Sequence, residues 1–390
     1  MTDPIVLPDP VLVNPSSVYT TTGTNGTLNY LSRDRTHLIG VGTSPYNRRP
    51  AVSHDWGVSW QYGGSNVAGA ALTAVIETND GELLCQVATS PVTMYKTSGW
   101  DPADGTFDSA TLVLTFNGSP LNWAFTPQAV APSWSQHNGL IFLAEYGSRL
   151  SEVVDDSLAG AHGWVSFDHG ATWTLAFDPL NYFDTDDYIH GHLGFADVYN
   201  QVAVMAGGDA GASPPGTTWL YWCPFEDLAA GGPWHRIETA FTTGAYAQLL
   251  NGLATPSGWV FGSDTTVAAA RIARVATLDF RRFGSLVTVA PINTYGPLAN
   301  TMWQNPEQPD APIFATSTQS STASGYPVIL ASLDGGLSWQ EAYRHEVAHT
   351  SGAGLRQAMG PNADGKVIAT IYTNVESGYI DFDLVPPMQL

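Results

Sequence analysis

The sequence is poor in charged residues, and basic residues are the scarcest. Charged residues fill 13% of the 390 positions, about half the usual share, and the 14 Lys and Arg include only two lysines, Lys96 and Lys366. With 35 acidic residues the formal net charge is −21. A chain without a basic face has no means of attracting nucleic acid or an anionic membrane, so we exclude both as partners.

Cysteine and long apolar segments are also scarce. Cys85 and Cys223 lie far apart in the sequence, which predicts two buried free thiols rather than a disulfide. The N-terminal sequence MTDPIVLPDP has no basic region and no long apolar run. We therefore expect a soluble protein without a Sec-type signal peptide or a membrane span, which would leave a cell by a route such as lysis.

Glycine, proline and aromatic residues are abundant instead. The chain has 39 Gly, 26 Pro and 13 Trp, and 11% of its residues are aromatic. This composition favours many short strands joined by tight turns and disfavours a helical bundle.

One eight-residue pattern, S-x-D-x-G-x-[ST]-W, occurs three times. Its fixed residues are Ser53, Asp55, Gly57 and Trp60 in the first copy, Ser166, Asp168, Gly170 and Trp173 in the second, and Ser332, Asp334, Gly336 and Trp339 in the third. The copies start 113 and then 166 residues apart. Two and three periods of about 55 residues account for both gaps, and a repeat near this length is typical of β-propellers.

The pattern fits a hairpin turn between the third and fourth strands of a blade. Asp accepts backbone N–H groups in its own turn, Gly permits a positive φ, and Trp anchors the turn on the core. These motifs are Asp-box (BNR) repeats, and the chain resembles the sialidase-like Asp-box propellers. The resemblance implies the fold but no single activity, because such propellers include glycosidases, carbohydrate binders, assembly factors and receptors.

We predict one all-β domain over residues 1–390, a propeller of about seven four-stranded blades, with six as the alternative count. Residues 21–390 form the blades, with degenerate turns near residues 109, 222 and 277. The chain ends before a fourth strand of the last blade, so residues 1–20, and Ile5–Val18 in particular, are expected to supply that strand and close the ring. The predicted second strands are Leu38–Gly42, Leu83–Ala88, Leu140–Tyr146, Val202–Ala206, Trp259–Gly262, Ile313–Thr316 and Val367–Tyr372.

Catalysis is left open by the sequence. A sialidase needs three arginines around a carboxylate, and no motif selects them, although Arg33, Arg149 and Arg356 could approach the channel. Other glycosidases need two carboxylates across a cleft, and nothing in the sequence pairs the candidates. The acidic candidates near inner strands are Glu77, Glu145, Asp197, Asp209, Asp264 and Glu307.

The segment around His190 and His192 is the strongest local candidate for a ligand site. On a strand these two side chains face the same way, and Gly207-Gly208-Asp209 ends the adjoining strand. Two His and Asp209 are a weak candidate metal set, but hydrogen bonding in a polar channel is the interpretation we favour, and we expect no metal or cofactor. A similar His-x-His followed by Gly-Asp occurs in some Asp-box propellers of phage and bacterial origin. With Trp303 and Arg356 added, these residues form the predicted ligand-binding set.

Five aromatic residues look exposed enough to stack on sugar rings, although packing between blades explains them equally well. They are Tyr46, Trp100, Trp134, Tyr182 and Trp303.

The functional hypothesis is a non-catalytic recognition or structural propeller. Its best setting is the virion of a phage, as a minor tail or tail-tip protein that binds host-surface carbohydrate. Partners would be other tail proteins or a cell-surface glycan, and homo-oligomers are compatible with this role. The alternatives are a glycoside hydrolase of the sialidase-like superfamily and an intracellular assembly factor.

Overall fold

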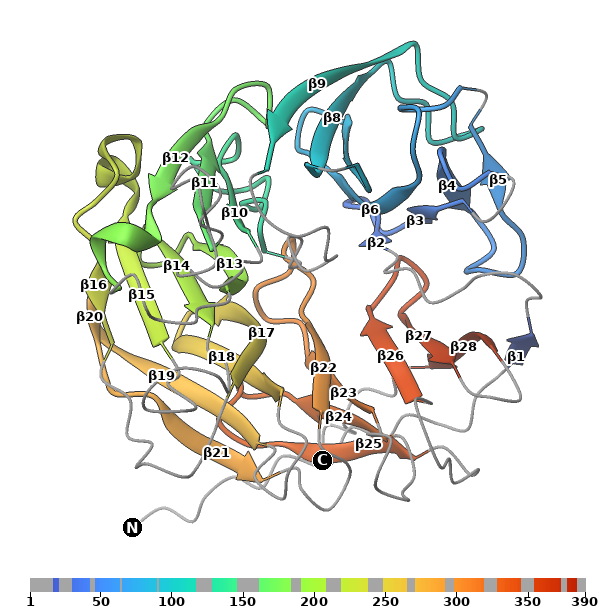
Figure 1. The fold of residues 1–390 in the computed structure, drawn as a ribbon. Coiled ribbons are helices and arrows are strands. Elements are labelled where there is room, and N and C mark those ends of the chain that lie inside the picture. The colour runs from blue at the N-terminus through green and yellow to red at the C-terminus, as the bar shows by residue number, and fades with distance from the viewer. Residues whose placement is uncertain are drawn as a thin grey trace.

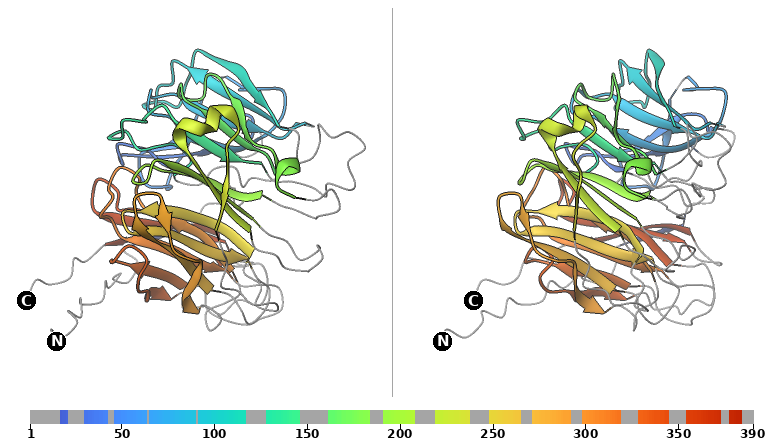
Figure 2. Two further views of the ribbon diagram at one scale, coloured as in Figure 1. Left: turned by 90° about the vertical axis from the view of Figure 1, so that its left-hand side faces the viewer. Right: turned by 60° about the vertical axis from the view of Figure 1, so that its left-hand side comes forward.

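The described strands form seven antiparallel blades, which are arranged in a ring around a common centre (Figure 1). Single bridges join blades five, six and seven into one 13-stranded sheet. The computed structural model describes residues 17–20, 30–42, 46–63, 65–89, 91–116, 128–145, 161–183, 191–207, 219–237, 248–264, 271–291, 298–318, 328–344, 354–372 and 377–383. Seen from the side the ring is a flattened body, and the short 3-10 helix η4 (Phe225–Ala230) lies at its rim (Figure 2).

The strands follow the chain around the ring. Blade one consists of β2 (Tyr30–Leu31), β3 (Leu38–Val41), β4 (Pro50–Ser53) and β5 (Gln61–Tyr62). Blade two consists of β6 (Leu72–Glu77), β7 (Leu83–Val87), β8 (Thr93–Ser98) and β9 (Ser109–Thr115). Blade three contains β10 (Ile141–Ala144), β11 (Gly163–Ser166) and β12 (Thr174–Phe177). Blade four consists of β13 (Gly191–Asp197), β14 (Val202–Gly207), β15 (Trp219–Pro224) and β16 (His235–Arg236). The 3-10 helix η3 (Pro179–Asn181) follows β12.

The last three blades contain most of the longer strands. Blade five is β17 (Gln248–Thr255), β18 (Gly258–Asp264), β19 (Arg271–Asp279), β20 (Arg282–Phe283) and β21 (Val287–Pro291). Blade six consists of β22 (Leu298–Trp303), β23 (Ile313–Thr318), β24 (Val328–Ser332) and β25 (Gln340–Arg344). Blade seven consists of β26 (Gly354–Met359), β27 (Lys366–Tyr372), β28 (Ser377–Asp383) and β1 (Ser17–Thr20).

The prediction of seven blades is confirmed, and each predicted second strand is a strand of the structure. Second strands such as β3, β7 and β14 are buried along their whole length, because a neighbouring blade covers each face. That is why they read as short continuous apolar runs. The outer strand β9 is exposed or half-buried at every residue except Leu114.

Ring closure by the N-terminal segment is also confirmed. Strand β1 pairs antiparallel with β28, from Ser17 opposite Asp381 to Thr20 opposite Gly378. The pairing strand lies at the end of the predicted range rather than along it, and residues 5–16 lie outside the described residues. Closure gives the last blade its fourth strand and covers the outer edge of β28, so that β1 becomes the edge strand of this blade.

Blade three departs from the four-stranded prediction in the described part of the chain. Its inner segment is not a named strand, but it runs beside β10 through a bridge between Val130 and Ile141. Phe142 N also donates to Ala129 O at 2.8 Å. The segment therefore takes the place of a first strand.

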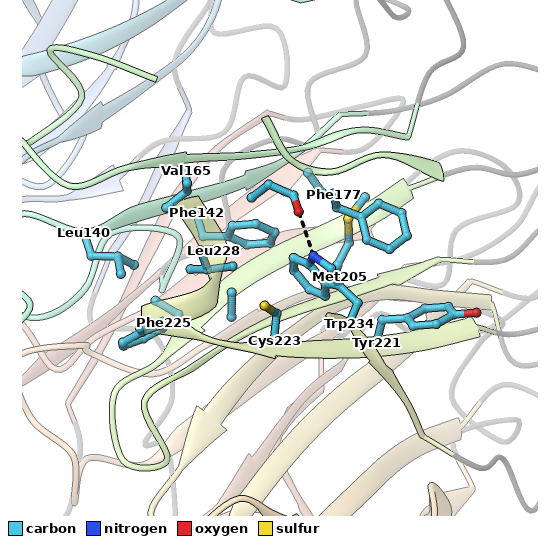
Figure 3. Packing of buried hydrophobic residues seen from close by; sticks show 14 of the residues in the cluster. Leu140, Phe142, Val165, Phe177, Met205, Tyr221, Cys223, Phe225, Leu228 and Trp234 are labelled. Carbon is cyan, nitrogen blue, oxygen red and sulfur yellow. Dashed lines mark hydrogen bonds between the residues drawn. The ribbon is translucent and has the colours of Figure 1, made fainter. Parts of the chain in front are cut away.

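Apolar clusters fill the spaces between blades and supply most of the burial. Figure 3 shows the cluster of blades three and four, in which Phe142, Phe177 and Met205 pack around Trp234. The Trp234 indole N–H donates to Ala176 O at 2.7 Å, so this buried polar atom is satisfied. Cys223 lies in the same cluster, and both cysteines are buried and free, as predicted.

Candidate functional site at one mouth of the channel

The three Asp boxes hold their own turns by a shared set of hydrogen bonds. In the first, Ser53 Oγ donates to Asp55 Oδ1 at 2.8 Å and accepts from Gly57 N at 2.7 Å. Asp55 also accepts from the N and Oγ of Ser59, at 2.8 and 2.6 Å. The corresponding atoms of the boxes that start at Ser166 and Ser332 make the same bonds.

These bonds keep the box carboxylates ionised. Burial pushes the pKa of Asp55, Asp168 and Asp334 upward, but hydrogen bonds from the neighbouring Ser or Thr outweigh it and hold each pKa below its ordinary value. Both carboxylate oxygens of each box accept bonds from within the turn. The boxes are therefore structural features of the blade rather than candidate catalytic acids.

Each box also contacts the preceding blade. Gly170 faces the Leu84 side chain of blade two, and Gly336 faces Val260 of blade five. In the first box, Trp56 Nε1 donates to Asp364 Oδ2 of blade seven at 3.2 Å. The boxes thus join neighbouring blades.

The turns between the first and second strands of the blades meet at one end of the channel. Ala363 N of blade seven donates to Arg35 O of blade one at 2.9 Å, and Trp134 Nε1 of blade three donates to Pro306 O of blade six at 3.2 Å. Figure 1 shows the turn after β22 reaching toward the centre of the ring. We call this end the first-turn mouth; its turns are residues 32–37, 78–82, 132–140, 198–201, 256–257, 304–312 and 360–365.

A charged network crosses this mouth. The Arg33 guanidinium of blade one pairs through Nη1 with Glu307 of blade six. Arg33 Nε donates to Glu77 O at 3.3 Å, and Arg33 N donates to Glu77 Oε2 at 2.8 Å, in blade two. Glu307 further accepts from Ser133 N at 3.1 Å and from Ser133 Oγ at 2.5 Å, in blade three. Four blades are therefore tied together by four residues; the sequence analysis named Arg33, Glu77 and Glu307 one at a time and did not name Ser133.

Burial dominates the titration of this network. It raises the pKa of Glu77 above the ordinary value, although the Arg33 N–H and charge act in the opposite direction. It also raises the pKa of Tyr30 to about 12, partly offset by Arg33. Tyr30 packs edge-on against Trp303, with ring centroids 5.7 Å apart.

We expect Glu77→Gln to stabilise the protein at pH 7 and to have no effect near pH 4. The pKa of Glu77 is higher in the folded state than in the unfolded state, so its protonated form is favoured by folding. This contribution to stability is fully present below the unfolded pKa and is lost as the pH rises through the folded pKa. The amide keeps an acceptor for Arg33 N without that loss. Urea denaturation between pH 4 and 8 measures the effect, and a loss of stability at pH 7 would contradict it. Glu341→Gln, in an exposed pair with Arg344, is the control.

Two other acidic candidates are enclosed by partners of their own. Asp197 is fully buried and accepts from Trp259 Nε1 and Asn200 Nδ2, both at 2.7 Å. Burial raises the Asp197 pKa despite these bonds. Glu145 is buried with His162, whose Nδ1 lies 3.0 Å from Glu145 Oε2.

The predicted ligand set is only partly described. His190 and Asp209 lie outside the described residues, as does the side chain of Arg356. His192 is buried, with Nδ1 3.0 Å from Leu249 O of blade five. Among the described residues no group of three or more His, Cys, Asp or Glu side chains could hold a metal ion. The set, including its weak metal candidate, stays a prediction.

Two of the five aromatic residues that look exposed in the sequence are not exposed. Trp100 is 8% exposed and Trp303 is 2% exposed, because both pack between blades, which is the interpretation that the sequence analysis gave beside sugar stacking. Tyr46 is exposed and stacks on Tyr62, with centroids 4.8 Å apart. Tyr182 is half-buried against Phe177. Trp134 is 48% exposed and is the aromatic platform at the first-turn mouth.

These features define an all-β, seven-bladed propeller with Asp-box turns. No protein-family model matches the chain, and no curated protein matches it in sequence. No helix in the described part of the chain is long and apolar enough to cross a membrane.

Solved structures share this fold at low identity. The structure of YCF48 bound to D1 peptide matches with a TM-score of 0.53 and 14% identity, covering 98% of this chain and 99% of that chain. Raptor from Chaetomium thermophilum matches at 0.55 and 10% identity, over 96% of this chain and 30% of that one. A chain of the Mitotic Checkpoint Complex matches at 0.52 and 12% identity, over 97% and 98%. At these identities the likeness shows the fold alone.

Proposed function

We propose that the chain is a non-catalytic recognition propeller. The observation that carries the proposal is the state of the candidate carboxylates. Glu307 is neutralised by Arg33 and bonded to Ser133, and Asp197 and Glu145 are buried on partners of their own. A glycosidase needs one carboxylic acid and one carboxylate that both reach the scissile bond. In the described part of the chain these acids serve the fold instead.

The setting we propose is a phage virion, with the chain as a minor tail or tail-tip protein that binds host-surface carbohydrate. Support comes from the sequence, through the low charge and the His-x-His resemblance to propellers of phage and bacterial origin. The chain should then be found in purified virions, and its absence from them would contradict this setting.

Turnover and binding together test the absence of catalysis. The purified chain should leave a panel of chromogenic glycosides uncleaved while it sediments with host cell walls. Cleavage that is abolished by Glu77→Gln would instead support the alternative of a glycoside hydrolase, since Glu77 is the described carboxyl group with a raised pKa near the channel.

The assembly-factor alternative is favoured by one observation. YCF48, whose full length this chain matches, is bound to a peptide in its structure, so a propeller of this size can act by binding a protein segment. Co-purification with a host protein from cells, together with absence from virions, would favour this alternative.

A further inference from the structure

Trp134 combines exposure with a fixed position. Its ring is 48% exposed, yet its indole N–H is held by Pro306 O at 3.2 Å. The neighbouring Ser133 is bonded to Glu307 through both its backbone N and its hydroxyl group. Because the N–H is already bonded, the face of the ring is the part of Trp134 that remains available to a ligand.

Tyr199 of blade four lies beside Trp134. The ring centroids are 5.8 Å apart and the planes are tilted by 40°. Tyr199 N donates to Asp197 Oδ1 at 2.9 Å, so the buried Asp197 fixes the backbone from which this ring projects. At this distance the two rings contact each other, so Tyr199 supports the Trp134 ring and the pair presents one aromatic surface.

An acidic side chain of the neighbouring blade-six turn adds negative charge near this aromatic pair. Asp310 is exposed and belongs to the same blade-six turn as Pro306. Its charge acts on the Tyr199 phenol, whose pKa lies well above the ordinary value because of burial first and then of the Asp197 and Asp310 charges. Two nearby cations are already paired: Arg33 with Glu307, and Arg281, which donates to Asn200 O, with Glu226. The site therefore lies in a negative field, on a chain with a net charge of −21.

We propose that Trp134, Tyr199 and Asp310 form a binding site for an organic cation, the Lys or Arg side chain of a basic segment on a partner protein. A cation over the face of a tryptophan is attracted by the ring quadrupole, and an adjacent carboxylate adds its charge. The negative field attracts such a segment and repels anionic ligands. A neutral sugar could stack on Trp134, but it would gain nothing from the charge of Asp310. The inference rests on the proposed recognition function and names the chemistry recognised at this mouth.

Titration calorimetry of the full chain with a hexa-arginine peptide tests the proposal. Trp134→Ala should weaken binding by about threefold to tenfold, Trp134→Phe by less, and Asp310→Asn by about threefold. The matched controls are Phe167→Ala, whose ring is also 48% exposed, and Asp108→Asn, an exposed acid of blade two. Neither control should change the affinity.

Two results would overturn the inference. Equal losses in the controls would mean that the peptide binds only through the net charge of the chain. Binding of neutral chitohexaose through Trp134, without binding of the peptide, would make this a sugar site. Either result leaves the proposed recognition function to its own tests, since sedimentation with cell walls and presence in virions do not depend on the peptide.

Discussion

Replacing Gly336 by alanine is expected to destabilise the propeller by about 2–5 kcal/mol, from a backbone penalty and an overpacking penalty together. Gly336 has a φ of +85°, where an L side chain is strained. A Cβ there would lie 2.4 Å from Val260 Cγ2, on β18 of the preceding blade. The clash falls where the Asp box joins blades six and five, so it opens the contact between them. The midpoint of urea denaturation, followed by tryptophan fluorescence, measures the loss.

Two other glycines separate the backbone penalty from the packing penalty. Gly365 has a φ of +79° and nothing within 4 Å of its Cβ position, so Gly365→Ala carries the backbone penalty alone, about 1–2 kcal/mol. Gly170, in the second box, has a φ of +85°, and its Cβ would meet the methyl ends of Leu84 at 2.9 Å. Those methyl groups can turn aside, so Gly170→Ala should fall between the other two. Equal losses at all three positions would mean that the boxes do not join the blades.

The sequence predicted the fold well because a propeller produces local and repeated patterns in its sequence. The three boxes fixed the period, and the buried second strands produced apolar runs at each predicted place, as in β7 and β14. Strand β1 followed from a physical need, since blade seven lacked a fourth strand. Only the pairing of β1 with β28 joins distant parts of the chain, and the missing fourth strand of blade seven predicted it without knowledge of individual contacts.

The candidate site depends on contacts between distant residues, which a single sequence cannot show. Arg33, Glu77 and Glu307 were each named as candidates near the channel, but Arg33 lies 44 residues from Glu77 and 274 from Glu307. The pairing arises because the ring places blades one, two and six around one mouth. Ser133 had no sequence signal. The proline-rich turn at 304–312, which contains Glu307, could have indicated an unusual connection.

Aromatic side chains were the least predictable. Trp303 and Trp134 have similar sequence surroundings, yet one is buried against Tyr30 and the other is exposed at the mouth. The difference comes from tertiary position: Trp303 is the last residue of inner strand β22, whereas Trp134 lies in a turn. A Trp in a propeller packs between blades unless a turn carries it beyond them.

Removing Arg33 should have the other large effect. Arg33→Ala takes away the only cation bonded to Glu307 in the described part of the chain, and that carboxylate is enclosed by blades one, three and six. Breaking an ion pair that is withdrawn from water leaves an uncompensated charge, which costs about 3–5 kcal/mol. The side chains of Arg33 and Glu307 are only 10% and 14% exposed, so we expect a loss toward this range rather than the small value of a surface pair.

Arg281→Ala is the matched control for this prediction. Arg281 pairs with Glu226 through two nitrogens, but the Glu226 side chain is 58% exposed. Solvent stabilises that carboxylate once its partner is gone, so the loss should be at most about 1 kcal/mol.

The double variant Arg33→Ala/Glu307→Gln decides the cause of the loss. If the unpaired Glu307 charge destabilises Arg33→Ala, the amide should restore part of the lost stability, and the two substitutions should be strongly non-additive. Additive losses would mean that Arg33 acts by packing and by its bond to Glu77 O rather than by neutralising Glu307. Recovery in the double variant would show that one ion pair at the first-turn mouth links blades one and six, which are not neighbours in the ring.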